Sequence, residues 1–102
     1  MATVLARYHA PTDLAAFNAY DASTHVPLAK TLPGLRSYEI NQGTVMTPGG
    51  PAPYHLVAIL KFDSMADIQA ALGSPIGQSV VAELGNFATG GVSVLMFDDK
   101  SA

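Results

Sequence analysis

The sequence contains no cysteine and no tryptophan, and charged residues make up only 13% of its 102 residues. Without cysteine, disulfides, thiolate catalysis and cysteine-ligated zinc are excluded. Five Lys and Arg stand against eight Asp and Glu, which gives a net charge of −3, and the basic residues form no cluster. Because sequence-independent binding of nucleic acids depends on such clusters, we expect no nucleic-acid partner.

Long apolar runs and cofactor motifs are also missing. No segment approaches the ~20 apolar residues of a membrane span, and residues 1–9 lack the apolar region of a signal peptide. We therefore expect a soluble, cytoplasmic protein that does not contact a membrane. His9, His25 and His55 are too dispersed to predict a metal site, and no glycine-rich phosphate or dinucleotide motif is present. We expect neither a metal nor an organic cofactor.

What the chain does contain is apolar surface, because hydrophobic residues make up 49% of it. The length suits one domain over residues 1–102 and is too short for two separate cores. The share of charged residues is about half the usual ~25% of a soluble domain. This deficit indicates buried area beyond the core of a monomer, most simply an interface with a second copy of the chain.

The hydrophobic pattern predicts four strands and two helical regions. Alternation or a short apolar run marks each strand, and Thr12 is a candidate helix cap. Pro27 discourages helical geometry at the residue before it, so the first helix should end or kink close to His25. The strands are predicted over 2–9, 35–44, 54–62 and 92–97, with a proline-rich loop over 47–53. The first helical region runs from 12–13 to about 25. The second consists of a helix over 65–72, an interruption at 73–75 and a further helical segment to about 87.

This order, β-α-β-β-α-β, is that of a ferredoxin-like α+β fold, with a four-stranded antiparallel sheet and both helical regions on one face. The strands over 54–62 and 92–97 are apolar on both faces, so the uncovered face also needs a partner. Two sheets that pack face to face would bury both, which predicts a homodimer through the sheet faces, a dimeric α+β barrel.

His25 is the foremost candidate for chemistry. It shares the apolar face of the first helix with Asp21, one turn earlier, so that a contact between the two at i, i+4 is available. A carboxylate there would orient the imidazole for general acid/base catalysis. The alternative is a structural histidine near a helix end that bonds carbonyl groups or Asp21 and does no chemistry.

Other candidates lie on the strands and in the predicted core. Tyr38 is a possible proton donor or oxyanion partner, or else a half-buried strand tyrosine with a satisfied hydroxyl. Arg7 could hold a carboxylate or phenolate of a substrate, or form an ion pair with Glu39 at the sheet edge. Four aromatic residues are candidates for the core or the wall of a substrate pocket: Phe17, Tyr20, Phe62 and Phe97.

Residues 17–38 carry a family resemblance. The pattern Phe17-x-x-Tyr20-x₄-His25-x-Pro27-Leu28, followed by Leu32-Pro33-Gly34-Leu35-Arg36-x-Tyr38, resembles the EthD family, whose relatives include fungal polyketide dehydratases and methylmuconolactone isomerases. The resemblance implies a dimeric α+β barrel with a small hydrophobic pocket between sheet and helices. It also implies site roles for His25 and Tyr38. The chain has no cysteine where a relative resembling the lactone isomerases uses one.

Three functions remain open. The first is a cofactor-independent enzyme for dehydration, cyclisation or isomerisation of a small hydrophobic oxygenated molecule, in which His25 acts as acid or base, Asp21 orients it and Tyr38 stabilises an oxyanion. The second is a non-catalytic protein that binds or carries a hydrophobic intermediate for an oxygenase system. The third is a dimer that serves only as an interaction protein, which predicts no ligand-sized cavity.

Overall fold

The computed structural model describes all 102 residues, and its centre is a four-stranded antiparallel sheet in the order β2-β5-β1-β6. Every neighbouring pair in this sheet is antiparallel, and β1 lies between β5 and β6. This order confirms the predicted ferredoxin-like fold. The strand bounds are β1 (Ala2–His9), β2 (Ser37–Ile40), β5 (Tyr54–Phe62) and β6 (Val92–Asp98).

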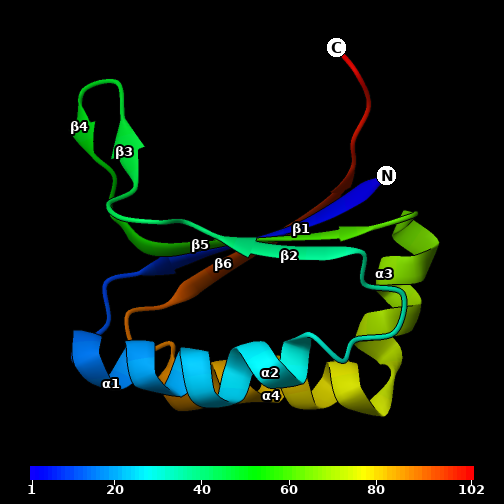
Figure 1. Cartoon of the computed structure of the whole chain (residues 1–102), viewed down its shortest axis with the longest axis horizontal. Helices are drawn as coiled ribbons and strands as arrows, with labels where there is room; N and C mark the ends of the chain where they lie inside the picture. Colours follow the sequence, from blue (N-terminus) through cyan, green and yellow to red (C-terminus); the bar gives the residue numbers. More distant parts are fainter.

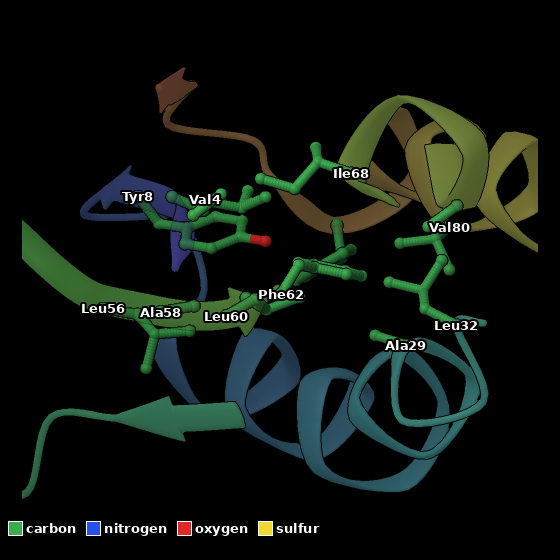
Figure 2. Packing of buried hydrophobic residues seen from close by; sticks show 14 of the residues in the cluster. Val4, Tyr8, Ala29, Leu32, Leu56, Ala58, Leu60, Phe62, Ile68 and Val80 are labelled. Carbon is green, nitrogen blue, oxygen red and sulfur yellow. The ribbon is translucent and has the colours of Figure 1, made fainter. Parts of the chain in front are cut away.

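A layer of helices lies on one face of the sheet, and one further helix, over 65–73, runs from the end of the sheet toward that layer, as Figure 1 shows. The helices are α1 (Leu14–Tyr20), the π-helix η1 (Asp21–His25), α2 (Val26–Ala29), α3 (Met65–Gly73) and α4 (Pro75–Phe87). Alternate residues of β1, namely Val4, Ala6 and Tyr8, point into this layer and are buried. They belong to a core of 15 buried hydrophobic residues, seen from close by in Figure 2.

The first helix begins at Asp13 rather than at Thr12. The Asp13 carboxylate accepts a hydrogen bond from the backbone N–H of Ala16 at 3.0 Å, as an N-cap residue does. Thr12 is instead held by Thr89, whose hydroxyl accepts from the Thr12 backbone N–H at 3.1 Å. The predicted cap was therefore wrong by one residue, because the loop before β6 competes for Thr12.

The same helical region does not end near His25, which was one of the two predicted outcomes; the irregularity that the prediction also allowed there is a π-helical turn. It widens into η1 and then continues as α2 through Pro27 to Ala29. Proline has no backbone N–H, so a helix that passes through it loses one hydrogen bond. In η1 the bonding changes to i→i+5, and the N–H of Val26 donates to the carbonyl of Asp21. The π-turn lets the chain remain helical across the proline.

Strand β2 is shorter than the predicted strand over 35–44. After Ile40 the side chain of Asn41 takes over the bonding, since its Oδ1 accepts from the N–H of Val57 at 2.8 Å and its Nδ2 donates to the Gly43 carbonyl at 2.8 Å. Gly43 then turns the chain with a φ of +77°, which favours glycine. The predicted loop over 47–53 contributes to a small hairpin, β3 (Met46–Thr47) and β4 (Gly50–Pro51), which projects away from the helix layer (Figure 1).

The corner between α3 and α4 rests on Ser74. Its hydroxyl donates to the carbonyl of Ala71 and accepts from the N–H of Gly77 at 3.1 Å. Gly77 packs so closely on the preceding turn that a Cβ there would lie 2.1 Å from the Ala71 carbonyl oxygen. Only glycine permits so close a contact between the two helices, and this tight corner directs α4 back under the sheet.

No helix and no second sheet layer covers the face of the sheet that points away from the helices. Its apolar part, which we call the open face, consists of Leu5, Val57, Ile59, Leu95 and Phe97, aligned across β5, β1 and β6 by the strand register. Leu95 and Phe97 are 43% and 44% exposed, so the prediction that Phe97 belongs to the core or to a pocket wall was wrong. No helix of the chain has both the length and the apolar character that crossing a membrane requires.

Candidate functional site

An apolar cavity of about 80 Å³ lies between the sheet and the helix layer. Val81 on α4 and Val94 on β6 line it and are 51% and 44% exposed, so the cavity reaches the surface between these two elements. Fourteen of its fifteen lining residues are hydrophobic, and the exception is His25. We call it the inner cavity, and its other lining residues are Val4, Ala6, Tyr8, Ala29, Leu32, Tyr38, Ala58, Leu60, Phe62, Leu72, Val80 and Leu84.

His25 is 3% exposed and sits at the end of η1, where it lines the inner cavity. Its ring packs against Phe87 at a centroid distance of 4.8 Å, and its Nδ1 is buried without a hydrogen-bond partner. Burial lowers the pKa of His25, while the negative charge of Glu83 acts in the opposite direction. The imidazole is therefore neutral at neutral pH and able to accept a proton.

Two tyrosines line the same cavity, Tyr38 from β2 and Tyr8 from β1. Burial, together with the charge of Asp21, raises the pKa of Tyr38 to about 12. Burial also raises the pKa of Tyr8, and Tyr38 and Asp21 add to the effect. Figure 2 shows the hydroxyl of Tyr8 pointing into the cluster. Both phenols thus remain protonated at neutral pH and can donate hydrogen bonds.

Asp21 and His25 do not form the predicted pair. No hydrogen bond joins them, and Oδ1 of Asp21 is buried without a partner, as is Nδ1 of His25. The physical reason is the π-turn: because η1 closes at i+5, the residue at i+4 no longer lies directly over residue i. His25 therefore lines the inner cavity, and Asp21 lines a different hollow.

That hollow, which we call the outer cleft, has a volume of about 450 Å³. It lies where α1 and η1 meet the ends of β2 and β5, and its lining residues are Asn18, Asp21, Ala22, Ile40, Asn41, Gly43, Thr44, Val45, Tyr54, His55 and Leu56. Burial raises the pKa of Asp21, and the charge of His55 opposes that rise. His55 is held by Asn18, with 2.7 Å between Nε2 and Oδ1.

Phe17 and Tyr20 lie behind His25 rather than in the inner cavity. Both pack on Phe87, with ring centroids 5.1 and 5.2 Å away, and Phe87 in turn contacts His25. The hydroxyl of Tyr20 donates to Glu83 at 2.9 Å. These aromatics support the imidazole, whereas Phe62, the third predicted pocket residue, is fully buried and lines the cavity itself.

Arg7 lies on the opposite side of the sheet from the inner cavity. It donates to the hydroxyl of Ser93 at 3.2 Å and lies 5.1 Å from the ring centroid of Tyr54. Its strand, β1, is central, with β5 between it and β2, and no ion pair with Glu39 forms. The expected edge ion pair was wrong because β1 is not an edge strand.

Sequence reasoning missed Tyr8 and Glu83 as site residues. Tyr8 lies on the first strand, and only the tertiary arrangement brings it to the same cavity as Tyr38. Glu83 reaches Tyr20 across 63 positions of sequence, and no local pattern signals such a contact.

Comparison with known proteins agrees with the fold. The EthD domain model matches residues 9–91. An uncharacterized 11.0 kDa protein in the thcB-thcC intergenic region of Rhodococcus erythropolis is 36% identical over 94 residues, which cover 92% of this chain and 90% of that protein. A solved EthD family protein from Bacillus halodurans, named after ethyl tert-butyl ether, has a TM-score of 0.88 at 25% identity and covers 98% of this chain and 99% of its own.

More distant structures share the fold. A hydroxynitrile lyase from Passiflora edulis has a TM-score of 0.75 at 15% identity, with 99% of this chain and 94% of that chain covered. Two further structures with this fold are described as dimeric proteins. The family match over most of the chain agrees with the resemblance seen in residues 17–38, and the chain belongs to the EthD family.

Proposed function

We propose that this protein is a cofactor-independent enzyme that transfers a proton on a small, mostly apolar oxygenated molecule such as a phenol, ketone or lactone. The observation that carries the proposal is one neutral imidazole and two protonated phenols that line a single, otherwise apolar cavity with an opening to the surface. A hydroxynitrile lyase built on the same fold indicates that the fold can house such chemistry.

The chemistry follows from the protonation states. The neutral imidazole of His25 takes a proton from a carbon beside a carbonyl group; the electron pair of the broken C–H bond forms a C=C bond, and the π pair of the C=O bond moves onto the oxygen. The hydroxyls of Tyr38 and Tyr8 donate hydrogen bonds to this oxyanion, inside an apolar cavity where such bonds are strong. The imidazolium then returns the proton to another carbon, which is an isomerisation, or to a hydroxyl group that leaves as water, which is a dehydration.

The buried atoms without partners support this assignment. A buried polar atom that lacks a hydrogen bond costs about 1–3 kcal/mol, so proteins retain few of them. Nδ1 of His25 is one. A ligand group in the cavity would give the imidazole the partner that the chain does not supply.

The size of the cavity limits the substrate. Its volume of about 80 Å³ is smaller than the ~150 Å³ of a cavity that holds benzene. The reacting carbonyl and a short apolar part would therefore enter, and the rest of the molecule would extend through the opening at Val81 and Val94.

The test is an incubation of the purified protein with mixed small lactones, phenols and β-diketones, with products read by mass spectrometry and binding by thermal shift. We expect product from the wild type, none from His25→Asn, and a reduced rate from Tyr38→Phe. His9→Asn is the matched control, since His9 is exposed and lines neither the inner cavity nor the outer cleft. Stabilisation without product, equal in His25→Asn, would overturn the enzyme and make the protein a carrier of a hydrophobic intermediate.

We further propose that two copies pack through the open face to form a homodimer. Five apolar side chains lie there without cover, and other proteins with this fold are described as dimeric. Isologous packing of this kind buries the same patch on both copies.

A further inference from the structure

We propose that the outer cleft is a second binding site, which takes a small protonated amine with an apolar body. Its volume of about 450 Å³ falls within the ~300–1,000 Å³ typical of ligand pockets, whereas the inner cavity does not. The proposal goes beyond the proton-transfer reaction and does not depend on it.

The carboxylate of Asp21 is the first argument for a cationic ligand. Asp21 is only 5% exposed, yet its Oδ1 has no hydrogen-bond partner, and no lysine or arginine lines the cleft. A buried carboxylate is ordinarily paired with a cation or with several donors. Here no donor bonds Oδ1, and the histidine whose charge acts on Asp21, His55, is hydrogen-bonded to Asn18 instead, so a ligand ammonium group would supply the missing donor.

His55 provides a second acceptor in the same cleft. Its Nε2 lies 2.7 Å from Oδ1 of Asn18, and since an amide oxygen can only accept, Nε2 is the nitrogen that carries the proton when the ring holds only one. Nδ1 then carries a lone pair, and His55 donates no other hydrogen bond. An ammonium group with its three N–H donors can serve more than one such acceptor, whereas an anion would meet only repulsion from Asp21.

The remaining wall accommodates an apolar body. Ile40, Val45 and Leu56 line the cleft beside the polar groups, and Ile40 is 48% exposed. A purely polar ion would leave this surface in contact with water. A ligand with an ammonium head and a hydrocarbon or aromatic body covers it and matches the division of the cleft into a carboxylate end and an apolar wall.

The test uses the full chain, labelled with ¹⁵N, at neutral pH and with benzylamine as the probe. We expect saturable shifts of the amide signals of Ala22, Thr44 and Leu56, which line the cleft. Benzyl alcohol, which has the same aromatic body without the charge, should bind with an affinity at least about tenfold lower. Benzoate should produce no shifts at these residues.

Two variants distinguish binding in the outer cleft from non-specific binding elsewhere on the protein. Asp21→Asn should weaken benzylamine binding about tenfold or more, because the amide keeps the shape and loses the charge. Ala22→Phe should abolish binding by filling the cleft from an exposed position on η1, and this test does not depend on the Asp21 variant. Ala19→Phe is the matched control, since Ala19 is also exposed, one turn earlier, and lines neither cavity.

Three results would overturn the proposal. The first is equal binding of benzylamine and benzyl alcohol, and the second is benzylamine binding that Ala22→Phe leaves unchanged. The third is a set of shifts at the cleft residues that depends on protein concentration alone, which would show that a second copy of the chain occupies the cleft. None of these results involves turnover, so none bears on the proton-transfer reaction.

Discussion

At the scale of single residues, the chain buries two ionisable side chains that it does not pair. Asp21 and His25 each keep a buried polar atom without a hydrogen bond, within one five-residue turn. Each such atom costs about 1–3 kcal/mol. A domain of this size has little stability to spare, and the two proposed sites give a reason why the chain keeps this arrangement.

The raised pKa of Asp21 predicts that Asp21→Asn stabilises the protein at neutral pH. The folded state holds the Asp21 proton more tightly than the unfolded state, whose carboxyl has a pKa near 3.8. The free energy of unfolding therefore falls as pH rises above 3.8 and through the folded pKa. The variant lacks this loss, so its melting temperature should exceed that of the wild type at neutral pH, by about 4–8 °C for each kcal/mol gained.

The control for this prediction is the pH dependence itself. Calorimetry or circular dichroism should show the advantage of Asp21→Asn shrinking as pH falls toward 3.8, where both states of the wild type become protonated. An advantage that is constant with pH, or a variant less stable than the wild type at neutral pH, would contradict the assigned burial of the charge.

His25 gives a second pH prediction of opposite sense. Burial lowers its pKa in the folded state, so the unfolded chain takes up a proton first as pH falls through 6.5. This histidine should therefore destabilise the wild type progressively below pH 6.5. In His25→Asn that part of the slope should disappear in denaturant titrations repeated across the range, whereas in the exposed control His9→Asn it should remain.

The sequence revealed which residues could react but not which of them meet. His25 and Tyr38 were identifiable from their pattern, and the structure brings both to the inner cavity. Tyr8 was not identified as a candidate, because its place beside Tyr38 depends on the order of the strands, in which β1 lies two strands away from β2. The supposed partner Asp21 was misplaced because helical spacing was taken as 3.6 residues per turn throughout.

At the scale of elements, alternation and apolar runs were sufficient to predict the four main strands and the helical regions. The errors lie where side chains alter backbone bonding. Asn41 ends β2 with its own amide group, and Pro27 is accommodated by a π-turn rather than by a helix end. Secondary-structure propensity alone cannot predict such changes in backbone hydrogen bonding. Each depends on which other donors and acceptors lie close to the backbone groups that lose their usual partners.

Two glycines of α4 should respond in opposite ways to the same substitution. Gly77→Ala would place a Cβ 2.1 Å from the Ala71 carbonyl oxygen and 2.6 Å from the Leu72 Cα, so we expect a loss of about 1–3 kcal/mol in the free energy of unfolding. Gly85→Ala meets nothing within 4 Å and should gain about 0.5–1 kcal/mol through helix propensity. Urea denaturation of both variants measures the difference, and a Gly77→Ala protein as stable as Gly85→Ala would contradict the described corner.

At the scale of the whole molecule, the open face explains the low charge of the sequence. Leu95 and Met96 offer a matched test, because they are neighbours on β6, 43% and 44% exposed, and point to opposite sides of the sheet. Leu95→Lys should convert the proposed dimer to a monomer in sedimentation analysis, since a charge would be buried in the interface. Met96→Lys should leave the oligomeric state unchanged.

Equal dissociation by both variants would show that sheet stability, not the open face, had been disturbed. A wild type that is monomeric at all concentrations would contradict the homodimer outright. The low share of charged residues predicted this surface from composition, and the strand register located it on five named side chains.

The π-turn has a consequence for how the sequence of this protein can evolve. A turn that closes at i+5 holds one residue more than a turn of α-helix, and each residue of a helix advances by about 100°. Deletion of a single residue from Asp21–His25 would therefore rotate everything downstream in the helix, and would carry His25 out of the inner cavity while Asp21 stayed in the outer cleft. A point substitution can alter the inner cavity or the outer cleft alone, whereas an insertion or deletion in this turn changes the position of one relative to the other. We therefore expect the length of this segment to vary far less among related sequences than the identity of its residues.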